Sequence, residues 1–295
     1  MAHIRIVLFG ETTVTDERGR ARSIAGVKSI RILEMLALQQ GQSLAKDVIA
    51  DRLWEGNPPP SWVSTLEGHV STLRRDIGCA GRTSALATTA KGYVLTEAGG
   101  VTVDVVEVRG LLQAASRADD RDRPGLVSKA MDLHRGTLLA GNVYSLWAEQ
   151  ARAELETQLV EACTDAARAS YRLGDHVTAR RLAQRAIDLD ECAEGAWQVV
   201  LESLEGLGRA GEALNAYGRL RAVMLDRVGV EPSPMSRAIY SRLLARDESG
   251  SSADRAELKV LMRLLRQRLE GWPGVVVPEQ DSRLAEVAAR ILAVA

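Results

Sequence analysis

The clearest pattern in the sequence is an apolar stripe at helical spacing that follows a proline cluster. The prolines at 58–60 disfavour a helix behind them and suit the first turn of a helix ahead of them. Ser61 is a candidate N-cap for that helix. The apolar positions recur at Leu66, Val70, Leu73 and Ile77. This spacing predicts a helix over residues 61–77 with one side packed on a core.

The opposite face of this predicted helix is small, polar and partly basic. It is formed by Ser64, Gly68, Ser71, Thr72 and Arg75, with Thr65 and His69 on one edge and Glu67 and Arg74 on the other. Such a helix can pack by one side and lie in a DNA groove by the other. An ordinary solvated face has the same pattern, so the neighbouring elements must decide between the two interpretations.

Short alternating segments predict a small antiparallel sheet at the N-terminus. Residues 3–9 alternate in the manner of a strand, and Gly10 ends that run. Two short polar segments follow at 12–15 and 21–24, separated by a turn-like stretch. We expect these segments to pair with one another.

Two helices are predicted between this sheet and the proline cluster. The first follows Gly26 and stops near Gly41, and the second is expected to be capped by Ser43 and to end at Trp54. After the third helix come two short β segments, 85–89 and 93–96.

The β segments are joined by a turn in which Gly92 can supply the positive φ that a hairpin needs. The order sheet, three helices, hairpin is that of a winged helix-turn-helix, whose last helix enters the major groove beside a wing. The sheet in front of the helices is the added feature of the OmpR-type subclass.

From residue 103 onward the pattern is helical and contains an internal repeat. Gly174 and Gly208 lie 34 residues apart, and Ala179 and Ala213 have the same separation. A 34-residue period of paired helices is the tetratricopeptide signature, although two helical hairpins of similar length would also produce such matches. The predicted fold class is therefore mainly α with a small β part: an N-terminal winged helix-turn-helix followed by a tetratricopeptide-like all-α domain.

Composition shifts suggest where these parts begin and end. We expect a DNA-binding domain at residues 1–98, a helical domain at 101–246, a polar linker at 247–255 and a helical extension at 256–295. The extension contains a basic amphipathic segment with leucines at 258, 261, 265 and 269. It can cap the last apolar face of the repeat, mediate dimers or help to form a ligand pocket.

Charge and cysteine content narrow the functional classes. The formal net charge is −1, and over residues 1–100 the 12 Lys and Arg exceed the 10 Asp and Glu by two, so any DNA-binding surface must be a local patch. The three cysteines at 79, 163 and 192 form no C-x-x-C pair, which favours reduced thiols over a disulfide framework or a metal site. No signal peptide and no 18-residue apolar run occur, so we expect a cytoplasmic protein without membrane partners.

Motifs of catalysis are absent from the sequence. It contains no G-x-x-x-x-G-K-[ST], H-E-x-x-H or G-x-S-x-G pattern. Its acidic residues lie on helix faces among arginines, as on a solvated surface. We therefore expect neither an enzyme nor a bound cofactor.

With these elements in place, the chain resembles the SARP-type actinobacterial regulators, which join an OmpR-type winged helix to a bacterial transcriptional activator domain. The resemblance covers residues 4 to about 244. Its matching residues are Lys28, Arg31, Leu53, Trp54, Thr65, Leu66, Gly68, Val70, Ser71, Leu73, Arg74, Arg75, Gly92, Tyr93, Gly208, Arg209, Glu212, Ala213, Leu214, Tyr217 and residues 229–234. The resemblance implies an activator, usually of secondary metabolism, that binds direct repeats in double-stranded DNA near promoters and contacts RNA polymerase.

A set of residues on the winged helix is predicted to contact DNA. Lys28 and Arg31 sit at the start of the first helix, where the helix dipole disfavours cations and an external phosphate would relieve them. The full set is Lys28, Arg31, Ser64, Thr65, His69, Ser71, Thr72, Arg74, Arg75 and Lys91. No catalytic or metal-binding residue is predicted.

The departures from the family pattern all remove positive charge. The family commonly has basic residues where Val63 and Thr72 stand in this sequence, and a third in the wing near Thr89. Since phosphate contacts supply much of DNA affinity, we expect weaker binding than in a typical member. The alternative function is a helical-repeat sensor of a small molecule or protein with a weakened winged helix. A homodimer and a small-molecule effector are further possible partners.

Overall fold

The computed structural model describes residues 4–78, 85–96 and 100–245. By its contacts the chain divides into two compact units, residues 1–239 and 240–295, and the first of them holds both sheets. The predicted loop at 79–83, the linker at 247–255 and the extension at 256–295 lie outside the described residues. Within the described ranges, no helix has both the length and the apolar character needed to cross a membrane.

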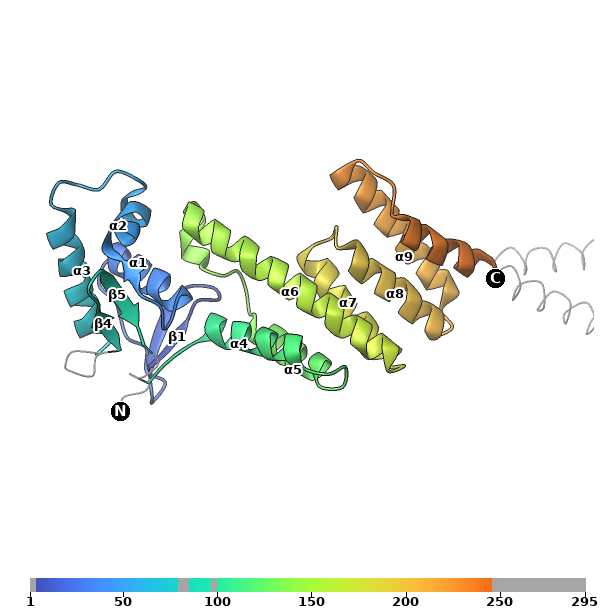
Figure 1. The fold of residues 1–295 in the computed structure, drawn as a ribbon, viewed down its shortest axis with the longest axis horizontal. Helices are drawn as coiled ribbons and strands as arrows, with labels where there is room; N and C mark the ends of the chain where they lie inside the picture. The colour runs from blue at the N-terminus through green and yellow to red at the C-terminus, as the bar shows by residue number, and fades with distance from the viewer. Residues whose placement is uncertain (1–3, 79–84, 97–99, 246–295) are drawn as a thin grey trace, which may run out of the picture. The chain divides into compact units, whose positions relative to one another are not determined.

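The N-terminal sheet, to which the strand labelled β1 in Figure 1 belongs, has the strand order β2-β1-β6. Strand β1 (Ile4–Val7) pairs antiparallel with β2 (Thr13–Asp16) and parallel with β6 (Val101–Val103). The sequence pattern missed β6, because three residues are too few to show a period. The expected strand at 21–24 is reduced to a single bridge between Thr15 and Ala21.

Three helices follow, as predicted: α1 (Val27–Leu38), α2 (Lys46–Trp54) and α3 (Trp62–Asp76). The prediction that Ser43 caps α2 is wrong. Residues Leu44–Ala45 form a short strand, β3, that pairs with the wing, so Ala45 becomes the N-cap. The Ser43 hydroxyl lies 2.7 Å from that of Thr89 instead.

The wing consists of β4 (Leu86–Thr88) and β5 (Gly92–Leu95), which join β3 in a second sheet of order β3-β5-β4. Gly92 is required for a different reason from the one predicted. Its φ is not in the left-handed region, but a Cβ at this position would lie 1.9 Å from the carbonyl oxygen of Leu44. The close approach of β3 to β5 therefore excludes a side chain here.

The second half of the unit is helical. It contains α4 (Asp104–Arg117), α5 (Arg123–Leu133), α6 (Leu146–Arg172), α7 (His176–Leu189), α8 (Glu194–Gly206) and α9 (Ala210–Val223), with a short 3₁₀ turn η2 (Ala140–Asn142) and a π-helical turn η3 (Met224–Val228). Residues 234–239, at the end of this unit, are helical as well.

The predicted 34-residue repeat is confirmed by the helix boundaries. Helix α9 begins and ends 34 residues after α7. Gly174 and Gly208, which precede these two helices, both adopt positive φ. Ala179 and Ala213 are fully buried, as small residues at a close helix–helix contact should be.

Backbone hydrogen bonds join the N-terminal sheet to the helical half. The Asp104 carboxylate, at the start of α4, accepts from the backbone N–H groups of Leu8 and Phe9 at 2.9 to 3.1 Å. Leu8 in turn accepts from Leu139 N–H at 2.8 Å, and Phe9 forms a β-bridge with Leu138. The segment that connects α5 to α6 thus pairs antiparallel with the residues that follow β1, which ties the winged helix to the helical half.

Candidate nucleic-acid interface

Helix α3 separates its buried side from its exposed side as its sequence predicts. Leu66, Val70 and Leu73 are at most 1% exposed, and α3 packs with this side against α1. The exposed positions Ser64, Gly68, Ser71 and Arg75 follow one another at helical spacing on the other side. We refer to these four residues as the reading face. Three of them are small, so the backbone of α3 can come close to a surface that it meets.

The N-terminal turn of α3 orients two predicted contact residues. Ser61 is the N-cap, as predicted, although its hydroxyl caps no backbone N–H. Its carbonyl oxygen accepts hydrogen bonds from the hydroxyls of Ser64 and Thr65, each at 3.0 Å. Both hydroxyls keep lone pairs free to accept from a ligand.

The charge of Lys28, on α1, acts on His69 at the edge of α3. The Lys28 ammonium lies 4.8 Å from the ring centre of Trp54, a cation–π contact with a half-buried ring. Burial lowers the pKa of His69, and the positive charge of Lys28 lowers it further. His69 is therefore neutral near pH 7, and Thr72 on the same edge is half-buried.

The side chain of Arg31 is held in a different environment from that of Lys28. Its Nε atom is buried and has no hydrogen-bond partner among the described residues. Burial raises the pKa of Glu34, and the positive charge of Arg31 lowers it. The guanidinium therefore lies near that buried carboxyl group. Although both cations were predicted to contact phosphate, Lys28 has the more open position for that role.

Arg74 connects α3 to the wing. Its Nε donates to the carbonyl oxygen of Leu86 at 2.9 Å, and its Nη2 donates to the Thr88 hydroxyl at 2.7 Å. Its guanidinium also lies 5.8 Å from the ring centre of Tyr93 on β5. These contacts hold the hairpin beside the reading face. They also engage the guanidinium of Arg74, which was predicted to contact DNA.

Among the predicted cationic contacts, Arg75 and Lys91 are exposed, whereas Lys28, Arg31 and Arg74 are half-buried. The Arg75 side chain is 75% exposed, and its Nε lies 3.6 Å from an Asp76 oxygen, a loose pair. The other Asp76 oxygen accepts from the backbone N–H of Ala25. Lys91 is exposed at the turn of the wing.

Sequence reasoning assigned no role to Lys46 or Glu67, which form a close ion pair beside the reading face. Lys46 Nζ lies 2.6 Å from Glu67 Oε1, and it is 5.6 Å from the ring centre of Tyr93. Each residue alone looked like an ordinary solvated charge. The signal was the place of Glu67 beside Gly68 on the edge of a helix expected to face DNA, where an acid is unexpected.

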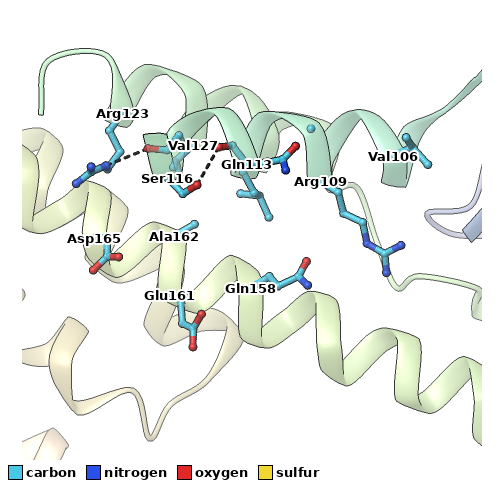
Figure 2. Close-up of a pocket in the computed structure, with 13 residues that line it drawn as sticks. Val106, Arg109, Gln113, Ser116, Arg123, Val127, Gln158, Glu161, Ala162 and Asp165 are labelled. Atoms are coloured by element: carbon cyan, nitrogen blue, oxygen red, sulfur yellow. Dashed lines mark hydrogen bonds between the residues drawn. The ribbon is translucent and has the colours of Figure 1, made fainter. Parts of the chain in front are cut away.

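A hollow of about 660 Å³ lies between α4, α5 and α6 (Figure 2). Leu112, Ala115 and Val127 give it an apolar part. Arg109 lines it and donates to the carbonyl oxygen of Leu38, the last residue of α1, at 2.8 Å. Glu161 and Asp165 lie on its α6 side. No cluster of ligands suited to a metal ion occurs among the residues that the structure describes.

Comparisons with known proteins match both halves of the chain. Residues 24–95 match the family described as "Transcriptional regulatory protein, C terminal", and residues 103–244 match the "Bacterial transcriptional activator domain". The regulatory protein DnrI of Streptomyces peucetius is 26% identical over 244 residues, which cover 79% of this chain and 90% of that protein. The transcriptional regulator RedD of Streptomyces coelicolor is 23% identical over 250 residues, which cover 83% and 71%.

A solved structure has the same fold. It is that of Mycobacterium tuberculosis EmbR in complex with a low-affinity phosphopeptide, with a TM-score of 0.69 and 24% identity. The match covers 88% of this chain and 71% of that one. Together with the order of its two domains, these similarities place the chain in the SARP family of bacterial transcriptional regulators, which combine an OmpR-type winged helix with a bacterial transcriptional activator domain.

Proposed function

We propose that this regulator binds double-stranded DNA with α3 in the major groove and the wing on the adjacent backbone. The observation that carries this proposal is the reading face, a stripe of small and polar residues exposed on a helix whose other side is fully buried. A row of small residues lets a helix approach base edges closely, and Arg75 at its C-terminal end can bond guanine or phosphate.

The two edges of α3 supply further contacts in this proposal. Lys28 flanks the reading face on the α1 side, and Lys91 flanks it at the wing. Ser64, Thr65, Ser71 and Thr72 offer hydroxyls to bases or phosphates, while Arg74 acts mainly by holding the wing. The domain limits that fit this division of labour are residues 1–98 for DNA binding and 101–246 for activation.

The helical half is proposed to contact RNA polymerase or a second copy of the protein at the promoter. Stacked helix pairs present extended surfaces that suit protein partners. The names of the similar proteins describe regulators, which agrees with such a role without defining the partner. Binding of two copies to direct repeats would place one helical half beside the next.

The test is a titration of the native upstream DNA with full-length protein at two salt concentrations, followed by fluorescence anisotropy. Arg75→Ala should weaken binding and make the dependence of log affinity on log salt less steep by about one unit if Arg75 contacts a phosphate. Arg180→Ala is the matched control, because Arg180 is exposed on α7, far along the chain from α3. Equal behaviour of the two variants would contradict the role of α3.

A small-molecule effector is a second candidate function, favoured by the hollow in Figure 2. Its volume of about 660 Å³ is in the range of drug-sized ligand sites. Arg109 joins its lining to the end of α1, so an occupant could act on the winged helix. The test is thermal stabilisation by a panel of metabolites, measured for wild type and for a Gln158→Trp variant that fills the hollow. Stabilisation of wild type alone would support an effector site. Equal stabilisation of both proteins would exclude the hollow as that site.

A further inference from the structure

The ion pair between Lys46 and Glu67 connects the first residue of α2 to the edge of α3. The two charged atoms are 2.6 Å apart, and the side chains are 28% and 52% exposed. The hydrogen bond from Lys46 to Glu67 is the main cause that raises the pKa of Lys46, so the ammonium stays charged. A cation at a helix N-terminus is disfavoured by the helix dipole, and the Glu67 carboxylate compensates for that.

The Lys46 ammonium is placed where a DNA phosphate would compete with the Glu67 carboxylate for it. The backbone N–H of Lys46 donates to the wing-turn carbonyl of Lys91 at 3.1 Å, so the ammonium of Lys46 is the group that can bind a phosphate. Lys46 therefore lies between the wing and α3, where the proposed binding mode brings the sugar-phosphate backbone. In the free protein the Glu67 carboxylate forms an ion pair with the Lys46 ammonium instead.

Glu67 also brings its own negative charge close to the reading face. It directly precedes Gly68 and lies three and four residues from Ser64 and Ser71, the spacing of neighbours on a helix surface. A carboxylate here repels phosphates and offsets the attraction that Lys46 would otherwise provide. The pair as a whole adds no net charge to the surface.

We propose that Glu67 limits the DNA affinity of this regulator by neutralising Lys46, so that one phosphate contact is withheld in the wild-type protein. This inference rests on the proposed DNA-binding function. Because binding to non-specific DNA is almost wholly electrostatic, the residue reduces non-specific binding at least as much as specific binding. Glu67 thus increases selectivity for specific sites by weakening the attraction of the protein to the DNA sugar-phosphate backbone.

Three other cations around the reading face, Lys28, Arg74 and Arg75, support this assignment. Lys28 is engaged by the Trp54 ring and Arg74 by the wing, and neither of these partners carries a negative charge. Arg75 has an acidic neighbour, but at 3.6 Å and with a side chain 75% exposed. Of Lys28, Lys46, Arg74 and Arg75, Lys46 lies closest to a carboxylate. Removal of that carboxylate should therefore increase phosphate binding most at Lys46.

The experiment compares wild type with Glu67→Gln, Lys46→Met and the double variant, all as full-length protein on native upstream DNA and on an unrelated fragment. Glu67→Gln should bind both DNAs more tightly, with a salt slope steeper by about 0.9. Its advantage over wild type should therefore be about 3.5-fold larger at 50 mM than at 200 mM salt. The double variant should return to the wild-type slope, because the freed cation has been removed.

The controls separate charge from folding and from the proposed function. Glu156→Gln removes one exposed acid on α6 and should leave the slope unchanged, and circular dichroism melting reports whether each variant is folded. A wild-type slope in Glu67→Gln would overturn the inference while leaving DNA binding intact. So would lost affinity confined to sites with cytosine at one position, since Glu67 would then accept from the cytosine amino group. Absence of DNA binding by the wild type at both salts would refute the proposed function as well.

Discussion

The side-chain amide of Asn142 donates a hydrogen bond of 2.5 Å to the carboxylate of Glu34, across 108 residues of sequence. Glu34 lies in α1 of the winged helix and is 2% exposed, and Asn142 lies in η2, just before the long helix α6. The other Glu34 oxygen accepts from the hydroxyl of Thr12. A buried acid is thus held by one partner from each half of the chain, which makes this contact a point of attachment between the winged helix and the helical half.

Asn142→Ala should destabilise the protein by about 1–3 kcal/mol, because it leaves a buried carboxylate oxygen without its donor. The free energy of unfolding in urea measures the effect. Asn57→Ala is the matched control, since Asn57 is exposed and its amide reaches only the carbonyl of Glu55 at 3.5 Å. If both variants were equally stable, the Glu34 contact would carry no weight in the junction.

Stability should also depend on pH through Glu34. Burial raises the pKa of its carboxyl group above 4.5, against the opposing effects of Thr12, Asn142 and Arg31. A group whose pKa is higher in the folded state stabilises folding fully below its unfolded pKa and loses that contribution as the pH rises through the folded value. Glu34→Gln cannot ionise, so its stability relative to wild type should increase as the pH is raised from below 4.5 to neutrality.

This pH prediction has a structural requirement that can be checked. The Asn142 Oδ1 atom is buried without a described partner, so rotation of its amide can present an acceptor to a glutamine at position 34. Denaturation curves at pH 4 and pH 7 give the comparison. A stability difference that stays constant between the two pH values would show that the Glu34 pKa is the same in the folded and unfolded states.

Gly68→Ala should stabilise the fold and weaken DNA binding at the same time. A Cβ at Gly68 would meet no atom within 4 Å, so the gain should approach the helix propensity difference of about 0.5–1 kcal/mol. The added methyl group would stand on the reading face, and we expect it to cost on the order of 1 kcal/mol of binding. Gly218→Ala on α9, equally open, should bring the stability gain alone. Unchanged DNA affinity in Gly68→Ala would show that DNA does not bind against the reading face at this position.

Arg74→Ala should destabilise the winged helix by about 1–2 kcal/mol, since it removes two hydrogen bonds to the wing and the contact with Tyr93. Arg75→Ala is the natural comparison, because that side chain is exposed and loosely paired, and its effect on stability should stay within about 0.5 kcal/mol. Urea denaturation of both variants tests the difference. A larger stability loss in Arg75→Ala would contradict the anchoring role of Arg74.

The local pattern was sufficient to predict the helices and the reading face. Helix α3, its buried stripe and the 34-residue spacing of α7 and α9 follow from periodicity and from glycines at helix ends. These features depend on contacts between residues close in sequence or on a period, and both are visible in one dimension. The same local signals predicted the proline-led start of α3.

Features that depend on distant partners were decided by the tertiary structure. Strand β6 and the two-residue β3 are too short to show a pattern, and each exists because another strand is there to accept it. Arg74 and Lys46 looked like free cations until folding brought Thr88 and Glu67 to them. The sequence by itself determined which face α3 exposes, because helical periodicity is local. Only the fold decided which cations beside that face already have partners within the protein, because those partners come from residues that are distant in sequence.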